Sequence, residues 1–455
     1  MRRTVSIIGG GGVRTPLLIH GMLRDQSLLN IGSLSLFDVD RKRTELMAGL
    51  GREIARVLDT DVQIDARESI ESAVEGSDFV LSSLRIGGMA ARARDERIAI
   101  DHGLAGQETT GPGGVAMALR TVPVALEHAR VVERLAPHAW FINFTNPAGL
   151  ITQALLQHTK LRVVGICDTP AELVHKISQA LAEPAADVQC DYAGLNHLGW
   201  VRRVLVRGQD VTGRLLADEH ALRQLYHADM FDPLLIRTLQ LIPSEYLFFY
   251  YSQRRAYQNQ IAAGASRGEE LMRLNGDLFS QLQSESPHDA LATYRRYLMK
   301  RNASYMRLEA EAGTGFQTPG DEPDPFDAPT GYHKIAVEVM MGLVSEQPRT
   351  VIVNVRNDGS IADLLAGDVV EVPCRISTNG VTASKVGALP ESVRGLVLAV
   401  KAYERSAIRA ATEKSWPMAL LAMLEYPIIG QWEIAENLRA TWKMADPEHL
   451  GYLEN

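Results

Sequence analysis

The chain has 455 residues, of which 46% are apolar and 22% charged, and its formal net charge is −8. This length exceeds the roughly 250–300 residues of a single core, so two domains are expected. The negative charge, with no block of Lys or Arg, argues against a nucleic-acid partner. No apolar run approaches the roughly 18–20 residues that cross a bilayer, which argues against a membrane protein.

The compartment can be inferred from the first residues and from the cysteines. The apolar stretch after the first two arginines ends in glycines after four residues, too soon for a signal peptide. Three cysteines are an odd number in a chain of this size, which favours reduced thiols over a disulfide framework. A cytoplasmic location is therefore expected.

The first forty residues have the pattern of a βαβ unit. A strand over Thr4–Ile8 leads into the glycine turn Gly9–Gly12, followed by a helix over Pro16–Arg24. A second strand over Leu34–Phe37 ends at Asp38. This order of elements is typical of a dinucleotide-binding fold.

The glycine turn predicts a site for a pyrophosphate, since backbone N–H groups and a helix N-terminus meet there. Gly9 and Gly11 fit the first two positions of G-x-G-x-x-G, but Arg14 occupies the third, and a merely tight turn is the alternative. A carboxylate at Asp38 can bind an adenosine ribose and disfavours a 2′-phosphate, so NAD is preferred over NADP. The predicted cofactor contacts are Gly9, Gly10, Gly11, Gly12, Val13, Arg14, Asp38 and Arg85.

Strands and helices continue to alternate up to about residue 170. This alternation predicts a Rossmann-type, doubly wound parallel sheet, and we assign residues 1–170 to an NAD-binding domain. The further predicted elements of this half are strands over Phe79–Leu84, Trp140–Phe144 and Val163–Ile166 and a helix over Arg120–Leu135.

The pattern changes after residue 170. A strand over Val201–Val206 is expected to belong to a different, antiparallel sheet, and long helical patterns fill 212–310. Gly313–Gly331 is rich in Gly, Pro and Asp and predicts a surface loop in preference to a catalytic lid. Residues 171–455 are therefore predicted to form an α+β domain for substrate, metal and oligomer contacts. Its other elements are helices over Ala171–Ala182, Tyr332–Val344, 390–413 and 415–442 and strands over Thr350–Val355 and Val369–Ile376.

Two segments carry side chains that bind metals. Cys167 and Asp168 follow a buried strand, at the sheet edge where open α/β folds bind ligands. Asn196 and His197 come about thirty residues later. One thiolate and one imidazole can hold a divalent ion and leave positions for substrate oxygens and water. The alternative for each is a small buried thiol and a hydrogen-bonded core imidazole.

Polar, glycine-punctuated loops are candidates to line a pocket. They are Arg85–Gly88 with Arg92 and Asp95, Gly106–Gly114, and Asn143–Pro147; surface ion pairs and turns are the alternative. The run Tyr246–Tyr251 is typical of helix core, yet a tyrosine can serve as a base where a cation lowers its pKa.

In this order, the segments resemble glycoside hydrolase family four, the NAD- and divalent-metal-dependent glycosidases typified by 6-phospho-glucosidases. The similarity extends over nearly the whole chain. It is carried by the glycine turn through Thr15-Pro16, Leu36–Asp40, Arg85–Gly88, Arg92–Arg97, Gly106–Gly114, Asn143–Gly149, Cys167-Asp168, Gly194–His197 and Ser266–Glu269.

The resemblance implies a mechanism outside the usual pair of carboxylates. NAD takes a hydride from C3 of the sugar, and the ketone makes the C2 proton acidic. A tyrosine removes that proton while a metal, typically manganese, acts as a Lewis acid. Elimination expels the aglycone, water adds, and the hydride returns to C3 without net oxidation.

The resemblance also implies roles for single residues. Cys167 and His197 are expected to bind the metal, with Asp168 as acid for the leaving oxygen. The run departs from the family's Tyr-Leu-x-Tyr-Tyr at Phe249, which leaves both Tyr250 and Tyr246 as candidates for the base, with Tyr250 favoured. The expected substrate contacts are Arg92 and Arg267, which resemble 6-phosphate ligands, together with Asn146 and Asn196.

Two departures bear on the substrate. Asp168 after the cysteine resembles the 6-phospho-α-glucosidases, whereas most of the chain resembles the 6-phospho-β-glucosidase branch, so β is favoured and α stays open. Arg14 stands where the family more often has Ser or Tyr, which adds a positive charge near the pyrophosphate or substrate.

The leading hypothesis is thus a phospho-glycosidase that acts on a phosphorylated sugar, depends on NAD and a divalent metal, with manganese as the candidate, and forms a homodimer or homotetramer. One alternative is a lactate/malate-type dehydrogenase, which consumes NAD and usually lacks the Cys167–His197 pair. Others are a glycosidase for another acidic or unphosphorylated glycoside and a non-catalytic NAD sensor.

Overall fold

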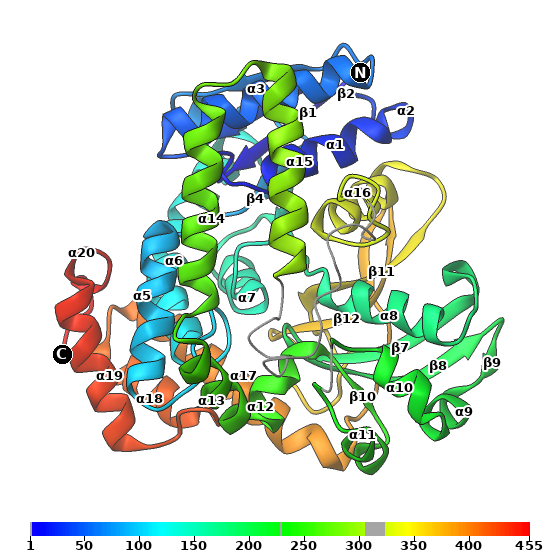
Figure 1. Ribbon diagram of the computed structural model, residues 1–455, viewed down its shortest axis with the longest axis vertical. Helices are drawn as coiled ribbons and strands as arrows, with labels where there is room; N and C mark the ends of the chain where they lie inside the picture. The colour runs from blue at the N-terminus through cyan, green and yellow to red at the C-terminus, as the bar shows by residue number, and fades with distance from the viewer. Residues whose placement is uncertain (1, 228–229, 305–323) are drawn as a thin grey trace.

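One sheet runs through the whole molecule. The computed structural model describes residues 2–227, 230–304 and 324–455, and within them thirteen strands form this sheet (Figure 1). The strands are β1 (Arg3–Ile8), β2 (Ile31–Phe37), β3 (Gln63–Ala66), β4 (Phe79–Ser82), β5 (Trp140–Asn143), β6 (Arg162–Gly165), β7 (Val188–Leu195), β8 (Leu198–Val206), β9 (Gln209–Asp210), β10 (Ile242–Pro243), β11 (Arg349–Arg356), β12 (Val369–Ser377) and β13 (Gly380–Ala383). Their order is β10-β8-β7-β12-β11-β6-β5-β4-β1-β2-β3, with β13 beside β12 and β9 beside β8.

The amino-terminal half confirms the predicted Rossmann-type sheet. Strands β1 to β6 pair in parallel, and the order reverses at β1, which lies between β2 and β4. The side chains of Val5, Ile7 and Ile8 in β1 are fully buried, as in parallel strands covered on both faces. The carboxyl ends of β1 and β4 meet at this reversal, the usual ligand site of such sheets.

Helices of this half follow the predicted alternation, with one longer than expected. Helix α6 begins at Pro112 and not at Arg120, because Pro112 takes the first helical position after Gly111. Gly111 has φ 82°, a conformation that favours glycine. The helices are α1 (Thr15–Arg24), α2 (Gln26–Leu29), α3 (Arg41–Val57), α4 (Ile70–Val74), α5 (Gly88–Asp101), α6 (Pro112–Leu135), α7 (Ala148–His158) and α8 (Thr169–Ala180).

The expectation of a separate antiparallel sheet is wrong. Strand β11 joins β6 in antiparallel pairing at Asn354 and Gly165, and β12, β7, β8 and β10 extend the same sheet. A β-carbon on Gly165 would lie 2.9 Å from the β-carbon of Asn354 and would overlap the hydroxyl of Thr152. The glycine therefore permits the close approach that continues the sheet.

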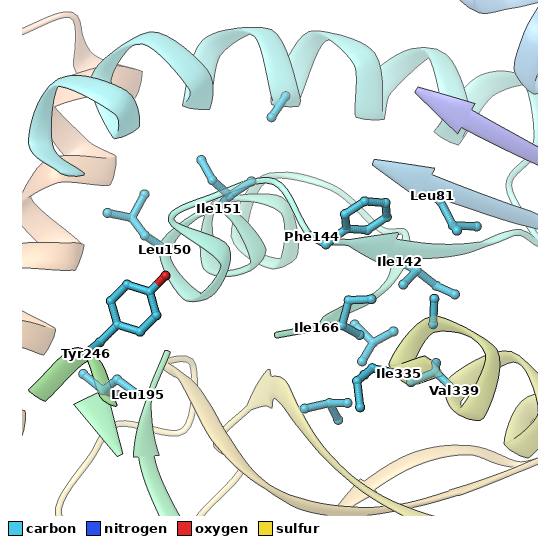
Figure 2. Packing of buried hydrophobic residues seen from close by; sticks show 14 of the residues in the cluster. Leu81, Ile142, Phe144, Leu150, Ile151, Ile166, Leu195, Tyr246, Ile335 and Val339 are labelled. Atoms are coloured by element: carbon cyan, nitrogen blue, oxygen red, sulfur yellow. The ribbon is translucent and has the colours of Figure 1, made fainter. Parts of the chain in front are cut away.

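The apolar core passes across this junction. Figure 2 shows Ile142 and Phe144 at the end of β5 and Ile166 after β6, close to Ile335 and Val339. The last two belong to helix α16 (Tyr332–Val344), which begins and ends as the sequence predicts. Burial of these side chains joins the two halves beneath the sheet edge that carries the site.

The carboxyl-terminal helices correct a second expectation. Residues 415–442 form two helices and not one, because the chain leaves helical geometry at Tyr426, just before Pro427, and turns at Gly430 with φ 57°. The helices of this half are α9 (Thr212–Ala217), α10 (Glu219–Gln224), α11 (Pro233–Leu239), α12 (Phe248–Tyr251), α13 (Gln253–Ala263), α14 (Arg267–Leu282), α15 (Pro287–Ala303), α17 (Glu391–Glu413), α18 (Trp416–Glu425), α19 (Trp432–Ala445) and α20 (Pro447–Leu450).

Helices α14 and α15 form a hairpin that extends from the second half over the first (Figure 1). Helix α14 begins with a capping box of Ser266 and Glu269, and it packs on α5. On α15, the Tyr294 hydroxyl donates a hydrogen bond of 2.7 Å to the Val13 carbonyl oxygen. This contact holds the hairpin against the glycine turn.

Two expectations remain predictions. Most of the loop Gly313–Gly331 lies outside the described residues, since only 324–331 of it are described. The division into domains at residue 170 is likewise not tested by the continuous sheet. Across the described part of the chain, no helix combines the length and apolar character that a membrane crossing requires.

Candidate active site

The glycine turn after β1 has the geometry of a dinucleotide cradle. Gly9 has φ 83°, and a β-carbon there would overlap the carbonyl oxygen of Ser83. The Gly9 and Gly10 N–H groups donate to the Phe37 carbonyl oxygen at 2.9 and 2.8 Å, which ties the turn to β2. Helix α1 then starts at Thr15, so the positive end of its dipole faces the turn.

Asp38 lies at the end of β2 beside this turn. Its carboxylate accepts hydrogen bonds from the Gly11 N–H at 3.2 Å and the Asp40 N–H at 3.1 Å. Burial raises the pKa of Asp38, and these two backbone donors oppose the shift. The remaining acceptor capacity of the carboxylate suits ribose hydroxyls.

A cavity of about 720 Å³ extends from this turn toward the sheet edge. That volume falls within the range of small-molecule and cofactor sites. Asp38 and Arg43 line one part, and Arg14, Glu108 and Asn146 line another. Of the predicted cofactor contacts, the cavity is lined by Gly9, Gly11, Gly12, Val13, Arg14, Asp38 and Arg85, but not by Gly10.

Glu108 forms ion pairs with two arginines of the cavity wall. Its carboxylate pairs with Arg85 at 2.7 Å and with Arg92 at 2.8 Å, and Arg92 also pairs with Glu96 at 2.8 Å. Burial by itself would raise the pKa of Glu108, but Arg85 and Arg92 outweigh it and lower that pKa far below its ordinary value. The charge of Arg92 is thus already compensated.

Arg14 is a further cation of this wall. Its guanidinium lies over the Tyr332 ring, 4.2 Å from the ring centroid, and no ion pair of Arg14 exists among the described residues. Burial alone lowers the pKa of Arg14, but Tyr332, Asp168 and Glu108 outweigh it and raise the pKa. Arg14 and Arg301 line both this cavity and a smaller one of about 120 Å³ that Asp168 also lines.

The predicted metal ligands meet at the sheet edge. Cys167 follows β6, and His197 lies in the β7–β8 hairpin with φ 60°. The Cys167 Sγ is 3.4 Å from the His197 Nε2, and both residues are buried. Metal–sulfur and metal–nitrogen bonds of about 2.3 and 2.1 Å, as for zinc, place two such ligands about 3.1–3.6 Å apart. The pair therefore fits a shared ion.

Burial is the largest influence on the ionisation of the pair. Burial raises the pKa of the Cys167 thiol, and Glu371 and Asp168 add to the shift. Burial lowers the pKa of His197 to about 4, so its imidazole is neutral, the form that binds metals. In the described residues no cluster of three Cys, His, Asp or Glu side chains with metal-site geometry exists, so the pair supplies two ligands.

The far side of the His197 ring contacts the loop before α6. Thr109 Oγ1 is 2.8 Å from His197 Nδ1, and Thr109 Oγ1 donates to Gln107 Oε1 at 3.0 Å. The sequence pointed to this loop as a pocket wall, but it gave no reason to connect Thr109 with His197. That relation depends on the tertiary approach of two distant segments.

The two candidate tyrosines have different surroundings. The Tyr246 ring stacks on the His197 ring at 3.7 Å between centroids and 4° between planes. Figure 2 shows Tyr246 extending from beside Leu195 toward helix α7. The Tyr250 hydroxyl instead lies 3.1 Å from the Tyr426 hydroxyl, which accepts the Gly111 N–H. Burial raises the pKa of both phenols well above the ordinary value.

The amides are held at the same edge. Asn196 Oδ1 accepts the Ala148 N–H at 3.1 Å, and its Nδ2 donates to Glu371 at 3.2 Å. Burial raises the pKa of Glu371 to about 7, against hydrogen bonds from Asn354, Asn196 and Tyr192. Asn146 lines the larger cavity, and its buried Oδ1 has no partner among the described residues. An unpartnered acceptor in a cavity wall suits a substrate hydroxyl.

Of the predicted substrate residues, Asn196 does not line either cavity, and neither does Arg267. Its guanidinium donates to Glu270 at 2.7 Å and to Ser304 at 2.6 Å, and it does not line the cavity. Cys167, His197 and Tyr246 do not line either cavity. Residues that the sequence did not assign to the site are Glu108, Thr109, Gln107, Arg301, Tyr332 and Glu371; the first three stood in a recognised motif.

Comparison with known proteins places this geometry in context. Residues 4–183 match the model described as Family 4 glycosyl hydrolase, and residues 192–429 match the Family 4 glycosyl hydrolase C-terminal domain. A Bacillus subtilis (strain 168) protein named "Probable 6-phospho-beta-glucosidase" is 30% identical over 443 residues, covering 95% of this chain and 93% of its own. The phospho-alpha-glucosidase PagL of Clostridium acetobutylicum is 25% identical over 459 residues, covering 96% of each chain.

A solved structure with the same fold carries the expected cofactors. The 6-phospho-beta glucosidase of Thermotoga maritima, with NAD and glucose-6-phosphate, superposes with a TM-score of 0.84 at 27% identity and covers 99% of each chain. A second structure of that enzyme, with manganese, NAD⁺ and glucose-6-phosphate, has a TM-score of 0.82 at 27% identity over 98% of this chain and 99% of its own.

Proposed function

The chain belongs to glycosyl hydrolase family 4, and we propose that it cleaves 6-phospho-glucosides, β-linked ones in preference, with recycled NAD and a divalent ion. The observation that carries the proposal is the Cys167–His197 pair, at 3.4 Å, beside a cavity that begins at a dinucleotide turn. A simple dehydrogenase needs the turn but not the pair. The preference for β-linkage rests on the greater identity to the β-glucosidase relatives.

Two separate sets of residues would bind the two cofactors. The glycine turn, the N-terminus of α1 and Asp38 would hold NAD, and Cys167 and His197 would hold the ion, for which manganese is the candidate. When bound, NAD accepts a hydride from C3 of the sugar and returns it, and the divalent ion supplies Lewis-acid stabilisation of charge on substrate oxygens. The protein's own side chains perform the proton transfers and hold the sugar.

Tyr246 is the better-placed base for the C2 proton. Its ring stacks on His197, whereas the Tyr250 hydroxyl is bonded to Tyr426 away from the pair. Burial of Tyr246 disfavours the phenolate, so a positive charge at the Cys167–His197 pair is needed to make it a base. We therefore place proton abstraction on Tyr246, although the sequence favoured Tyr250.

Asp168 and the amides complete the substrate side. Asp168 lines the smaller cavity next to Arg14, which suits the delivery of a proton to the leaving oxygen. Asn146 offers its unpartnered Oδ1 to a sugar hydroxyl, and Asn196, in the turn of the β7–β8 hairpin, is held by hydrogen bonds with Ala148 and Glu371. Hydrogen bonds to fixed partners orient the sugar for elimination.

Arg14 is our candidate for the acidic group of the substrate. Arg92 is paired with Glu96 and Glu108, and Arg267 is paired with Glu270. Arg14 forms no ion pair within the described residues, so a bound anion gains most from Arg14. A guanidinium binds a phosphate through two parallel hydrogen bonds. Arg301, which lines the same two cavities, would add a second cation.

We also propose a cytoplasmic homodimer or homotetramer. The helices α17 to α19 carry exposed apolar side chains, and such a surface suits a second copy. They are Leu398, Leu421, Leu424, Trp432 and Met444. A free Cys167 thiol as metal ligand requires a reducing compartment. Light scattering on the purified protein and on Trp432→Glu tests the assembly: a shift to monomer supports this surface, and an unchanged mass contradicts it.

The proposed activity is tested with paired 4-nitrophenyl α- and β-glucoside 6-phosphates under reducing conditions. Nitrophenol should appear only when NAD and manganese are both present, faster from the β-anomer, and without net NADH. Release without either cofactor contradicts the proposal. Stoichiometric NADH supports the lactate/malate-type alternative, and activity on unphosphorylated or other acidic glycosides alone supports a different substrate in the same family.

A further inference from the structure

We propose that Gln107 and Thr109 act as positioning residues that fix the tautomer of His197, so that its Nε2 lone pair faces Cys167 and the metal. The inference rests on the proposed metal site, and it concerns residues outside the assigned ligands. It follows from the direction of each hydrogen bond in one buried chain of three side chains. Each of these side chains is at least nine-tenths buried, so water does not compete for the bonds.

The chain of hydrogen bonds begins at Gln107 Oε1, which its partners identify as an acceptor. Gln107 Oε1 lies 2.5 Å from the Thr109 N–H and 2.6 Å from the Thr110 N–H. Backbone N–H groups are obligate donors, so the side-chain atom that they share is the amide oxygen and not the amide nitrogen. The orientation of the Gln107 amide is thereby determined.

The Thr109 hydroxyl links the Gln107 amide oxygen to the His197 ring. It has a single hydrogen, and that hydrogen is donated to Gln107 Oε1 at 3.0 Å. Thr109 Oγ1 is therefore an acceptor toward His197 Nδ1, 2.8 Å away, and Nδ1 carries the proton. In a neutral imidazole the other nitrogen, Nε2, then has the free lone pair, and it lies 3.4 Å from Cys167 Sγ.

Backbone packing holds the loop where this chain of bonds requires it. A β-carbon on Gly113 would overlap the Gln107 carbonyl oxygen, and one on Gly114 would overlap that of Thr109. The start of α6 can therefore lie directly against the loop. On the other side, Tyr246 stacks on the His197 ring with only 4° between planes, so the ring cannot turn freely. The histidine is fixed in plane, position and tautomer.

Thr109→Val removes the hydroxyl at nearly constant shape, and Thr109→Ser keeps it as the matched control. Loss of a hydrogen bond that orients a metal-binding histidine typically weakens metal affinity about 10- to 100-fold. We expect that weakening for Mn²⁺ in Thr109→Val, measured by electron paramagnetic resonance of free Mn²⁺, and a change under about threefold in Thr109→Ser. NAD affinity, measured by fluorescence, should be unchanged in both.

A second readout needs no metal. ¹⁵N-histidine NMR of the metal-free protein, with His197→Gln to identify the signal, should show the Nδ1–H tautomer in the wild type and in Thr109→Ser. Thr109→Val should gain the Nε2–H tautomer. An Nε2–H tautomer in the wild type, or wild-type Mn²⁺ affinity in Thr109→Val, overturns the inference. Failure of the wild type to bind Mn²⁺ at all would instead refute the proposed metal site. If Thr109→Val does not fold, the tautomer measured in the wild type still tests this inference.

Discussion

The sulfur of Cys167 lies 3.4 Å from the Nε2 of His197, although the two residues are thirty positions apart in the chain. One follows the last parallel strand, and the other lies in the first antiparallel hairpin, so the pair spans the junction between the two kinds of pairing. A soft thiolate with a neutral imidazole is a donor set for a divalent transition metal.

Cys167→Ser tests this pair. The substitution removes the soft ligand, so Mn²⁺ affinity and glycosidase activity should each fall at least about tenfold. NAD affinity should be retained, because the glycine turn and Asp38 do not contact Cys167. Cys190→Ser, at a half-buried thiol in β7, is the matched control and should resemble the wild type. Equal loss in the two variants would contradict a specific role for Cys167.

Tyr246→Phe and Tyr250→Phe separate the two candidate bases. General-base catalysis typically contributes about 10²–10⁴-fold, so kcat of Tyr246→Phe should fall by that factor with little change in Mn²⁺ affinity. Tyr250→Phe loses only its bond to Tyr426 and should retain kcat within about tenfold. The measurement is kcat with saturating NAD and manganese. The reverse ranking would return the role of base to Tyr250.

Arg14→Ser tests the anion contact. A charge-assisted hydrogen bond contributes about 1.5–3 kcal/mol, so kcat/KM for a glucoside 6-phosphate should fall about 10- to 100-fold. The unphosphorylated glucoside should lose little or nothing. Arg24→Ser, at the far end of helix α1 and paired with Asp327 at the surface, is the control. An equal loss on both substrates would assign Arg14 to the fold or to the cofactor.

Asp38→Asn probes the choice of cofactor. The carboxylate at the end of β2 favours a ribose diol and repels a 2′-phosphate, so its neutralisation should weaken NAD and relatively improve NADP. We expect the ratio of the two dissociation constants to shift by about tenfold, since one charged interaction changes. Fluorescence titration of each nucleotide measures it. An unchanged ratio would exclude Asp38 from ribose recognition.

Two buried histidines away from the metal pair predict acid sensitivity of the fold. Burial, with Arg24, lowers the pKa of His20 to about 4, and burial, with Lys334, lowers that of His333 to about 3. Since both are below the unfolded value near 6.5, the folded state favours neutral imidazoles. Their stabilising effect is full above about pH 6.5 and is lost as the pH falls toward 4.

The free energy of unfolding should accordingly decrease by up to about 4 kcal/mol from pH 6.5 to 4.5 through these two groups. Urea unfolding at several pH values measures it. His333→Gln, which does not titrate, should show a shallower decrease than the wild type over this window. Parallel curves for the two proteins would show that His333 does not contribute.

The local parts of the site were predictable from the sequence. The strand, glycine turn, helix and Asp38 follow one another within forty residues, and each has its own pattern of apolar spacing or turn chemistry. The break of the last long helix was also readable in principle, since Tyr426 precedes Pro427. Such features depend on neighbours in the chain.

Relations between distant segments were not predictable in this way. The continuation of the sheet depends on a single pairing of Asn354 with Gly165, which leaves no periodic signal in either segment. Tyr246 and Tyr250 are four positions apart on a short aromatic run, and the choice between them depends on which ring contacts His197. The contact of Thr109 with His197 likewise arises only when α6 and the hairpin are brought together.

The central claim, that the glycosidic bond is broken by elimination after temporary oxidation, is tested most directly by turnover in D₂O. Cleavage of 4-nitrophenyl β-glucoside 6-phosphate with NAD and manganese should place deuterium at C2 of the released glucose 6-phosphate, without accumulation of NADH. Product with only hydrogen at C2 would contradict the account, because direct hydrolysis leaves that bond intact.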